Sequence, residues 1–544
     1  MSSVLPVLIV GGGPVGLTAS LLLSDLGVDS LLVERNPSTT DHPKAHVVNT
    51  RTMEIFRALG IEAAVRSAAL PIAGFGHIRW VRSLAGAEVG RLDTAMKRGD
   101  VSPTGLVSCA QDRVESFLLE AAGKRRGRIR FGTELVSLEQ DRSGVTARLG
   151  DETIRARYVI AADGASSGVR RQLGIAMSGL PEVATLVGTY FHADLRHLFE
   201  ARPAVLYWVM NTAAPGTFIA LDGAMRWVFH LGQPGAGVEL GAEEAERLIK
   251  LAIGEPGVAV DVRSIRPWRM TAQIAERYRE GRVFLVGDAA HRFPPTGGLG
   301  LNTGVQDVHN LAWKLALVLS RAAPESLLET YETERRPVAE ANSNFSLGNF
   351  LHGGTAIGPG ALATMVALEG GGPDVPAVLA QLHADIEAGR EHFGSQSMDL
   401  GFVYAAGAIV PEDDAPPVVV DPSADYVPDA RPGARVPHVW LEHDGARVST
   451  HDLVGKDFVL LCAGAAEPWL SGVTASGITL TGITLTGITL THATVDPGPP
   501  FGLEPGGALL VRPDGHVAWR SVSPPGDPAK TLDAVIRQVI DPAV

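Results

Sequence analysis

Cysteine is nearly absent from this chain: only Cys109 and Cys462 occur among its 544 residues. The two lie far apart, without a CxxC pair or a Cys/His cluster, so neither a disulfide framework nor a structural zinc site is expected. Such cysteine usage is typical of a reducing compartment. The sequence therefore predicts a cytoplasmic protein that binds no metal.

Positive charge is also scarce, with 47 Lys and Arg against 60 Asp and Glu and a net charge of −13. An acidic chain is a poor partner for nucleic acid or for an anionic membrane. No apolar run approaches the ~20 residues that cross a bilayer. The apolar N-terminus carries no Lys or Arg before it, and GGGP interrupts it, unlike a secretory signal. We therefore expect no nucleic-acid or membrane partner.

What the chain does contain, near its start, is a nucleotide-binding pattern. The apolar run Val7–Val10 predicts a buried parallel strand, and residues 18–26 predict a helix. Between them, Gly11 permits a tight turn, Gly13 leaves room for a pyrophosphate, and Gly16 lets helix and strand pack closely. The N-terminus of the helix supplies free amides and a partial positive charge for an anion.

An acidic residue completes this pattern at the end of the second predicted strand, residues 29–33. There Glu34 is placed to accept hydrogen bonds from a ribose. The next residue, Arg35, lies either against the adenosine or in an exposed ion pair. The ligand predicted is a dinucleotide that contains adenosine, and this segment alone leaves NAD and FAD open.

Two later segments repeat the arrangement of a strand followed by a polar turn. In residues 156–175 an apolar strand leads to Asp163. In residues 281–317 a buried strand delivers Asp288 at its carboxyl end, where open α/β sheets bind ligands. A proline and glycine loop, 293–300, and a long amphipathic helix, 302–321, follow. The start of this helix predicts a second site for negative charge.

Together, GGGPVG with Glu34, the ADG segment and GDAAHRFPPTGGLGLNTGVQD resemble the FAD-dependent aromatic hydroxylases, the single-component flavoprotein monooxygenases. Residues 45–60 and 432–441 resemble the phenol hydroxylase and chlorophenol monooxygenase branch, which includes actinobacterial polyketide hydroxylases. The resemblance covers nearly the whole chain. It implies FAD as cofactor and NADPH or NADH as a transient co-substrate, because no second glycine fingerprint appears.

The activity that this resemblance implies is hydroxylation of a phenolic or polycyclic aromatic substrate by dioxygen, through a flavin C4a-hydroperoxide. Two alternatives stay open. One is a Baeyer–Villiger or epoxidising monooxygenase that acts on a polyketide, and the other is a non-catalytic, flavin-bound redox sensor. Arginine far outnumbers lysine, which is typical of a high-GC bacterium and favours antibiotic biosynthesis. The resemblance also favours a homodimer.

The expected fold class is α/β: a Rossmann-like FAD-binding domain assembled from separated segments, an antiparallel-sheet substrate domain, and a C-terminal thioredoxin-like domain. With 45% hydrophobic residues, the chain is long enough for such cores. The expected domains are residues 1–180 for the first part of the FAD-binding domain, with some substrate-domain insertion near 76–104; 181–265 for the substrate sheet; 266–345 for the second FAD-binding part; 346–429 for a helical segment and linker; and 430–544 for the thioredoxin-like domain.

The C-terminal domain contains neither a CxxC nor another redox motif, so a packing or dimer role is expected for it. It also carries a threefold pentapeptide repeat, residues 476–490. Because the repeat length of five is odd, successive copies would face opposite sides of a strand. The simplest interpretation is a surface insertion that the fold tolerates.

Cofactor contacts are implied at all three motifs. Within the resemblance, Asp288 accepts hydrogen bonds from ribityl hydroxyls, and the amides of Leu301 and Asn302 point at the flavin pyrimidine edge. Arg51 and Gln111 either contact the cofactor or pair locally. The full set of expected cofactor contacts is Gly11, Gly13, Pro14, Gly16, Glu34, Arg35, Arg51, Gln111, Asp163, Asp288, Pro295, Gly298, Gly300, Leu301 and Asn302.

His46 is the candidate catalytic residue, because histidine is readily tuned to act as a base near neutral pH and its position matches a polar residue beside the substrate hydroxyl in this branch. The alternative is a histidine that bonds the backbone or the flavin ribityl chain. Tyr207, Trp227 and Phe229 are candidates for the substrate pocket, although strand aromatics are more often plain core. Residues 225–231 lack the tyrosine that phenol hydroxylases pair with an arginine, which leaves phenol activation open.

Overall fold

The computed structural model describes residues 4–71, 76–93, 100–232, 240–351, 356, 360–390, 396–412, 426–471, 473–474, 477–480, 483–486 and 489–542. For residues 473–474, 477–480 and 483–486 it describes the backbone alone. The predicted repeat at 476–490 therefore lies largely outside the described side chains. Its described backbone forms two antiparallel strands, β23 (Gly477–Leu480) and β24 (Ile483–Thr486).

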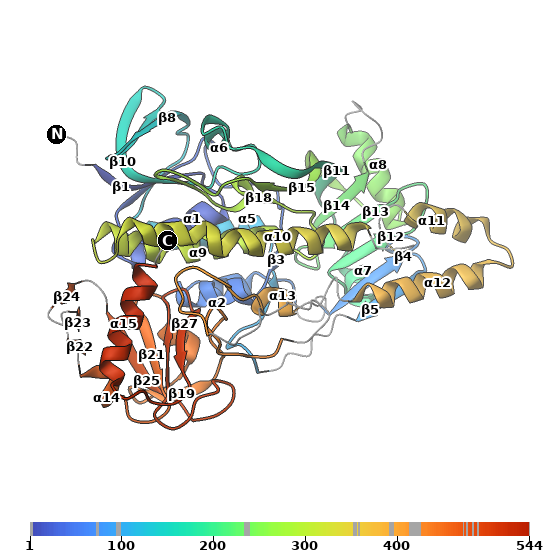
Figure 1. Cartoon of the computed structure of the whole chain (residues 1–544). Helices are drawn as coiled ribbons and strands as arrows, with labels where there is room; N and C mark the ends of the chain where they lie inside the picture. Colours follow the sequence, from blue (N-terminus) through green and yellow to red (C-terminus); the bar gives the residue numbers. More distant parts are fainter. Residues whose placement is uncertain are drawn as a thin grey trace.

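The first body is built on an eight-stranded sheet whose central strands are parallel (Figure 1). Its strands come from three separated parts of the chain, because β10 pairs with β1 on one side and with β17 on the other. Its order is β16 (Arg279–Glu280), β17 (Val283–Leu285), β10 (Glu152–Ala161), β1 (Leu5–Val10), β2 (Ser30–Val33) and β7 (Arg128–Arg130), with β8 (Leu135–Asp141) and β9 (Gly144–Leu149) continuing from β10.

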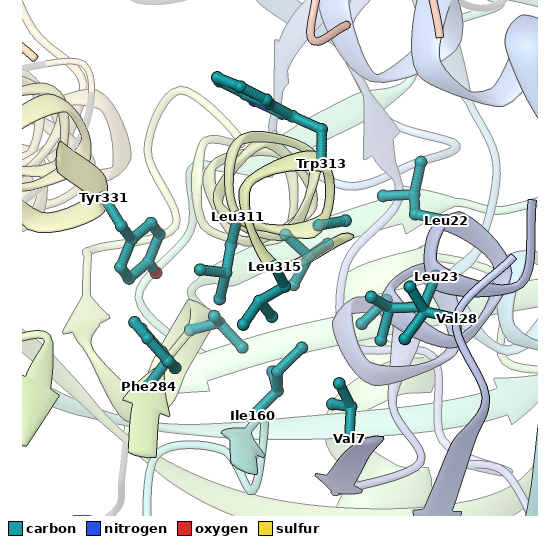
Figure 2. Close-up of a cluster of buried hydrophobic side chains, with 14 of the residues drawn as sticks. Val7, Leu22, Leu23, Val28, Ile160, Phe284, Leu311, Trp313, Leu315 and Tyr331 are labelled. Atoms are coloured by element: carbon teal, nitrogen blue, oxygen red, sulfur yellow. The ribbon is translucent and has the colours of Figure 1, made fainter. Parts of the chain in front are cut away.

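The central parallel strands are buried on both faces, as their apolar sequences predict: nearly all residues of β1 and β2 are buried. Figure 2 shows Val7 and Ile160 of the sheet below Leu311 and Leu315 of the long helix α9. The covering helices are α1 (Pro14–Asp25), α5 (Gln111–Gly123) and α9 (Gly300–Leu319), with α2 (Thr50–Ala58), α3 (Glu62–Ser67) and α10 (Thr330–Leu351) around them.

The second body is a separate eight-stranded sheet, antiparallel except where β12 runs parallel to β4. Two of its strands come from the insertion expected near residues 76–104. Helices α7 (Arg196–Ala201), α8 (Ala242–Ile253), α11 (Ala361–Gly370) and α12 (Val375–Ala388) accompany it. The order is β18 (His291–Arg292), β15 (Asp261–Ala275), β11 (Met177–His192), β14 (Arg226–Gly232), β13 (Gly216–Ala220), β12 (Leu206–Val209), β4 (His77–Val81) and β5 (Glu88–Asp93).

The third body lies beyond the linker and holds a four-stranded sheet flanked by α14 (Glu467–Leu470) and the final helix α15 (Pro528–Ile540) (Figure 1). A hairpin turns around Asp514, because β26 pairs with β27 on either side of it. Strand order is β25 (Leu490–Thr494), β21 (Phe458–Cys462), β26 (Ala508–Val511) and β27 (Val517–Ser521), with a separate hairpin of β19 (Trp440–His443) and β20 (Ala446–Ser449).

These bodies confirm the predicted α/β fold, with its nucleotide-binding sheet assembled from separated segments. The first helix begins at Pro14 rather than at residue 18, because proline suits the first position of a helix, where its missing N–H costs nothing. Cys109 and Cys462 are both free and buried. Among the described helices, none has the length and apolar character that crossing a bilayer requires.

Two glycines make the first turn tight. A Cβ at Gly11, where φ is +112°, would lie 2.2 Å from the Ala162 carbonyl oxygen. A Cβ at Gly16 would lie 2.0 Å from the Gly11 carbonyl oxygen. The backbone of the turn, the α1 helix and the end of β10 therefore touch directly, and no larger residue fits.

The linker helix α13 (Gln396–Leu400) is attached to the first body through Asp399. Its carboxylate accepts a hydrogen bond of 2.8 Å from Asn49 Nδ2 and another from the Thr50 amide. Burial raises the pKa of Asp399 to about 7; the Asn49 and Thr50 hydrogen bonds oppose that shift, and the nearby Glu54 adds to it. At neutral pH this carboxyl therefore sits near its titration point.

Gly16→Ala is expected to destabilise the chain by about 2–3 kcal/mol, because the added methyl overlaps a backbone oxygen that cannot move freely. The matched control is Gly123→Ala at the end of α5, where an added Cβ meets nothing within 4 Å. Chemical denaturation followed by circular dichroism measures both. Equal stability of the two variants would contradict the close packing described.

Asp399→Asn is expected to make stability less dependent on pH. In the wild type, the folded state keeps a proton between about pH 4 and pH 7 that the unfolded chain loses, so the Asp399 contribution falls as pH rises. The free energy of unfolding of the variant, minus that of the wild type, is expected to rise by about 1 kcal/mol per pH unit in this window. Urea titrations from about pH 5 to pH 8 test this; a constant difference would refute it.

Candidate active site

The first part of the site is the turn between β1 and α1. A Cβ at Gly13 would meet nothing within 4 Å, so space above the turn is open. Helix α1 begins at Pro14 without an acidic residue in its first turn, and no described side chain caps its N-terminus. Its first amides are therefore available to an anion such as a pyrophosphate.

Glu34 lies beside this turn at the end of β2. Its Oε2 accepts a 2.7 Å hydrogen bond from the Gly12 amide, and its Oε1 accepts from the amide and side chain of Asn36. A carboxylate has about four acceptor positions, so hydroxyl groups of a ligand can still bind. Arg35 is exposed at the rim.

Asp288 follows β17 in the short turn η1 (Gly287–Ala289). Its side chain is exposed to solvent, and desolvation by nearby protein atoms raises the pKa of Asp288. The neighbouring cations Lys44 and Arg292 oppose that shift. A solvent-accessible carboxyl between cations is suited to a polar ligand, and together with the turn before α1 and the start of α9 it forms the candidate cofactor recess. Lys44 escaped the sequence analysis, although it stands two residues before His46.

The start of α9 is the third part of the site. The first intrahelical bond joins the Thr303 amide to Leu299, so the preceding amides are left for a ligand. No described side chain caps this N-terminus, and its first turn holds no acid. Gly298, at φ +66°, closes the preceding loop; a Cβ there would lie 2.9 Å from Val47 Cβ, and its amide bonds the Pro295 carbonyl.

The Asn302 side chain serves the protein itself. Its Nδ2 donates to the Val47 and Gly298 carbonyls at 3.0 and 2.7 Å, and its Oδ1 accepts from the Asn49 amide at 3.0 Å. It thereby ties the glycine loop to β3 (Val47–Val48). The backbone amide of Asn302, rather than its side chain, remains free for a ligand.

Three of the predicted cofactor residues are tied to protein groups. The Arg51 guanidinium is buried and donates to Glu54 at 2.8 Å and to the Asp514 carbonyl, so it faces the C-terminal hairpin instead of the glycine turn. The Gln111 side chain bonds Glu115 and the Ala45 amide. Asp163 accepts from the Val169 amide through Oδ2, while its buried Oδ1 meets no hydrogen-bond donor among the described residues.

The predicted catalytic histidine belongs to a cluster of three. His46 Nδ1 lies 3.0 Å from Ser108 Oγ, and His42 Nδ1 lies 2.6 Å from Ser264 Oγ. His230 approaches from β14: a Cβ at Gly188 would be 3.1 Å from its ring and 3.7 Å from His42 Nε2. Burial lowers the pKa of each histidine to about 4, so all three are neutral at pH 7. Sequence analysis named only His46 as a candidate.

A tyrosine and an arginine do pair in this sheet. Arg226 Nε donates to Tyr190 Oη at 2.9 Å, and Arg226 Nη2 bonds Asp112 at 2.6 Å. The Tyr190 hydroxyl also lies 2.8 Å from His192 Nε2. The missing tyrosine of residues 225–231 is supplied by β11, because strand neighbours are set by pairing and not by distance along the chain.

The predicted pocket aromatics lie on the other face of the sheet. Alternation along β14 directs Trp227 and Phe229 away from His230. With Tyr207 they form part of the core shared with Phe218 and Phe199, where the ring centroids of Phe218 and Phe229 lie 4.4 Å apart. Tyr207, Trp227 and Phe229, which were predicted to line the pocket, therefore lie in the core on the face opposite Tyr190 and His230. The face with Tyr190 and His230 contacts the first body through Arg226 and Asp112.

Comparison with known proteins adds two family models that together span most of the chain. The model described as the FAD binding domain matches residues 4–346, and the one described as aromatic-ring hydroxylase, C-terminal, matches residues 429–543. Among the described residues, no group of three or more His, Cys, Asp or Glu is arranged to hold a metal ion.

Similar proteins resemble the chain along its entire length. A putative polyketide hydroxylase of Streptomyces halstedii is 38% identical, over 98% of this chain and 96% of its own. The 2,4-dichlorophenol 6-monooxygenase of Delftia acidovorans is 35% identical, over 98% of both chains. The crystal structure of the flavin-dependent monooxygenase PieE with FAD and substrate has a TM-score of 0.89 and 36% identity, over 99% of this chain and 100% of that one. This chain therefore belongs to the FAD-dependent aromatic-ring hydroxylases and is a flavoprotein monooxygenase.

Proposed function

We propose that this monooxygenase hydroxylates a polycyclic phenol or quinone of the aromatic polyketide class. The observation that carries the proposal is the cluster of His42, His46 and His230, all neutral at pH 7, where the loop before β3 meets the sheet face that holds His230. Relatives support it: one is named tetracenomycin B2 monooxygenase-dioxygenase, from Streptomyces olivaceus, and a similar structure holds aklavinone-11 hydroxylase with FAD and aklavinone.

FAD fits the three parts of the recess. The amides of α1 are suited to the pyrophosphate, Glu34 to the adenosine ribose, Asp288 to the ribityl hydroxyls, and the amides at the start of α9 to the pyrimidine edge. Lys44, near Asp288, adds positive charge for the phosphates. When bound and reduced, FAD supplies an electrophilic oxygen atom taken from dioxygen.

His46 has the role of receiving the proton of the substrate hydroxyl. If Nδ1–H donates to Ser108, the free Nε2 is an acceptor, and the lowered pKa keeps it unprotonated at neutral pH. A base with a pKa of about 4 does not deprotonate a resting phenol. It orients the hydroxyl, and it takes the proton as the ring carbon is oxidised and the hydroxyl becomes acidic.

Neutral histidines also determine which substrate is favoured. His42 and His230 offer hydrogen bonds without positive charge, which suits hydroxyl and carbonyl oxygens better than a carboxylate. Arg226 on this face is engaged by Asp112 and Tyr190, whereas Arg266 and Lys44 lie near enough to His42 to lower its pKa. These cations favour electron-rich oxygens such as those of a phenolate or a quinone, so we propose a polycyclic aromatic compound with several oxygens as the substrate class.

The nicotinamide co-substrate docks transiently beside Asp163 in this proposal. Arg170 and Arg292 lie there, and desolvation lowers the pKa of both guanidinium groups, with repulsion from Arg171 contributing. Clustered arginines attract the phosphates of NADPH or NADH despite the net negative charge of the chain.

We also propose that the enzyme works in the cytoplasm, because its two cysteines are free and buried. The family resemblance supports the further proposal that it is a homodimer.

Product analysis tests this function. Purified enzyme with FAD and NADPH is offered a panel of simple phenols and polycyclic hydroxyquinones, and NADPH oxidation and product mass are followed. Faster oxidation with a polycyclic compound, and a product one oxygen heavier with its ring carbons intact, is expected. A ring-expanded ester would show a Baeyer–Villiger reaction, and an epoxide would show epoxidation; either product would contradict hydroxylation. Turnover with simple phenols alone would overturn the polycyclic class.

His46→Ala is expected to retain FAD but to slow hydroxylation by about 100-fold, or to divert NADPH oxidation to hydrogen peroxide, because the hydroxyl proton loses its acceptor. The control is His197→Ala; His197 is exposed and pairs with Glu255 at 3.0 Å on the surface. Stopped-flow hydroxylation rates and peroxide yield measure both. If His46→Ala couples NADPH to product as well as the control does, His46 has no part in the chemistry.

A further inference from the structure

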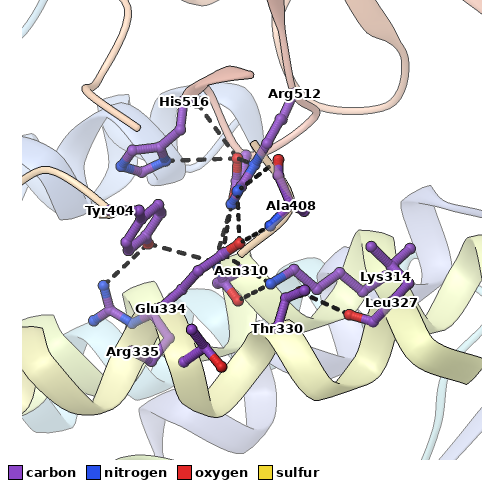
Figure 3. A network of polar contacts seen from close by, with 12 residues as sticks. Asn310, Lys314, Leu327, Thr330, Glu334, Arg335, Tyr404, Ala408, Arg512 and His516 are labelled. Atoms are coloured by element: carbon purple, nitrogen blue, oxygen red, sulfur yellow. Dashed lines mark hydrogen bonds and ion pairs between the residues drawn. The ribbon is translucent and has the colours of Figure 1, made fainter. Parts of the chain in front are cut away.

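The C-terminal domain is joined to the flavin-binding body by a buried ionic network (Figure 3). Arg512, at the end of β26, donates through Nη1 and Nη2 to both carboxylate oxygens of Glu334 on α10, each at 2.8 Å. Its Nε donates to Asp514 at 3.0 Å. Lys314 of α9 also bonds Glu334 at 2.8 Å. These four side chains have at most 1% of their surface exposed.

The network continues into the linker at Tyr404. The Tyr404 hydroxyl accepts from Arg335 Nη1 at 3.3 Å and from Asn310 Nδ2 at 3.4 Å. Its ring packs against His516 of β26–β27, with centroids 4.5 Å apart. Tyr404 therefore contacts the C-terminal hairpin on one side and Arg335 of α10 on the other, as Figure 3 shows.

From Arg335 the contacts lead to the flavin recess. Arg335 Nε donates to Asp307 Oδ1 at 2.9 Å, and its Nη2 donates to the Thr303 carbonyl. The other oxygen of Asp307 accepts from the Gly287 amide at 3.0 Å and lies 2.6 Å from His291 Nε2. Asp307 thus holds both ends of residues 287–291, the loop that carries Asp288.

We propose that the C-terminal domain is a positioning element for this loop, and that Tyr404 and Arg335 transmit its docking to Asp307. A carboxylate buried this deeply keeps its charge only while its donors stay in place. Arg335 is in turn oriented by Tyr404. Losing the Tyr404 hydroxyl loosens Arg335, then Asp307, and then the loop beside the flavin. This gives the C-terminal domain, which has no CxxC pair, a function in cofactor binding. The proposal rests on the FAD site and not on the substrate proposed above.

A second interdomain contact provides the control. Arg435 Nη1 donates to the Tyr426 hydroxyl at 3.2 Å, and Arg435 Nε bonds Glu54 of α2 at 3.0 Å. Tyr426 is also buried, and it too accepts from a buried arginine between the same two bodies. Its described contacts lead through Arg435, Glu54 and Arg51 to the Asp514 carbonyl, and none of these four side chains bonds Arg335, Asp307 or residues 287–291.

The test compares Tyr404→Phe with Tyr426→Phe in the full-length enzyme, without substrate. Both variants lose a tyrosine hydroxyl and are expected to lower the melting temperature by similar amounts. Only Tyr404→Phe is expected to weaken FAD binding, by about fivefold in a fluorescence titration. It is also expected to speed amide hydrogen exchange of the peptide with residues 287–291 in the FAD-free protein.

A second variant, at Arg335, tests the same role with a larger expected loss of FAD affinity. Arg335→Lys keeps a positive charge near Asp307 but removes the planar group that reaches Tyr404 and Asp307 together. It is expected to exceed Tyr404→Phe in both measurements. If both variants match Tyr426→Phe in FAD affinity and in exchange of the loop, the positioning role is refuted, whatever the activity of the enzyme.

Discussion

The buried carboxylate of Asp307 is the interaction on which the arrangement depends most. It stands within α9, whose first turn leaves its backbone amides free and whose later turns carry Asn310 and Lys314 toward the C-terminal domain. One oxygen of Asp307 holds the loop of residues 287–291, and the other holds Arg335. A single helix thereby fixes the distance between the flavin loop, α10 and the third body.

Ionic contacts of this kind are costly to bury. Each desolvated charge is unfavourable by several kcal/mol, and removing one partner of a buried pair costs about 3–5 kcal/mol. Arg512 binds both carboxylate oxygens of Glu334 at once, and Arg335 joins Asp307 to Tyr404. Such forked contacts require a defined placement of the groups that they join, so they favour one relative position of the domains.

The sequence was most informative where function needs a local backbone shape. Gly11 and Gly16 were predicted correctly as close-packed turn residues, because strand, turn and helix are contiguous there. The sequence was less informative where partners come from distant strands. Arg51 faces the C-terminal hairpin, and Tyr190 rather than a neighbour pairs with Arg226. No pattern within a segment encodes such pairings, since they arise only when the bodies assemble.

The most direct measurement of the central claim is a titration of the purified, FAD-free chain with FAD, followed by flavin fluorescence and absorbance. If the turn before α1, the loop at Asp288 and the start of α9 form one site, each chain binds one FAD, and the absorbance bands shift as the isoalloxazine leaves water. A chain that is folded by circular dichroism but neither binds FAD nor alters its spectrum would contradict the account.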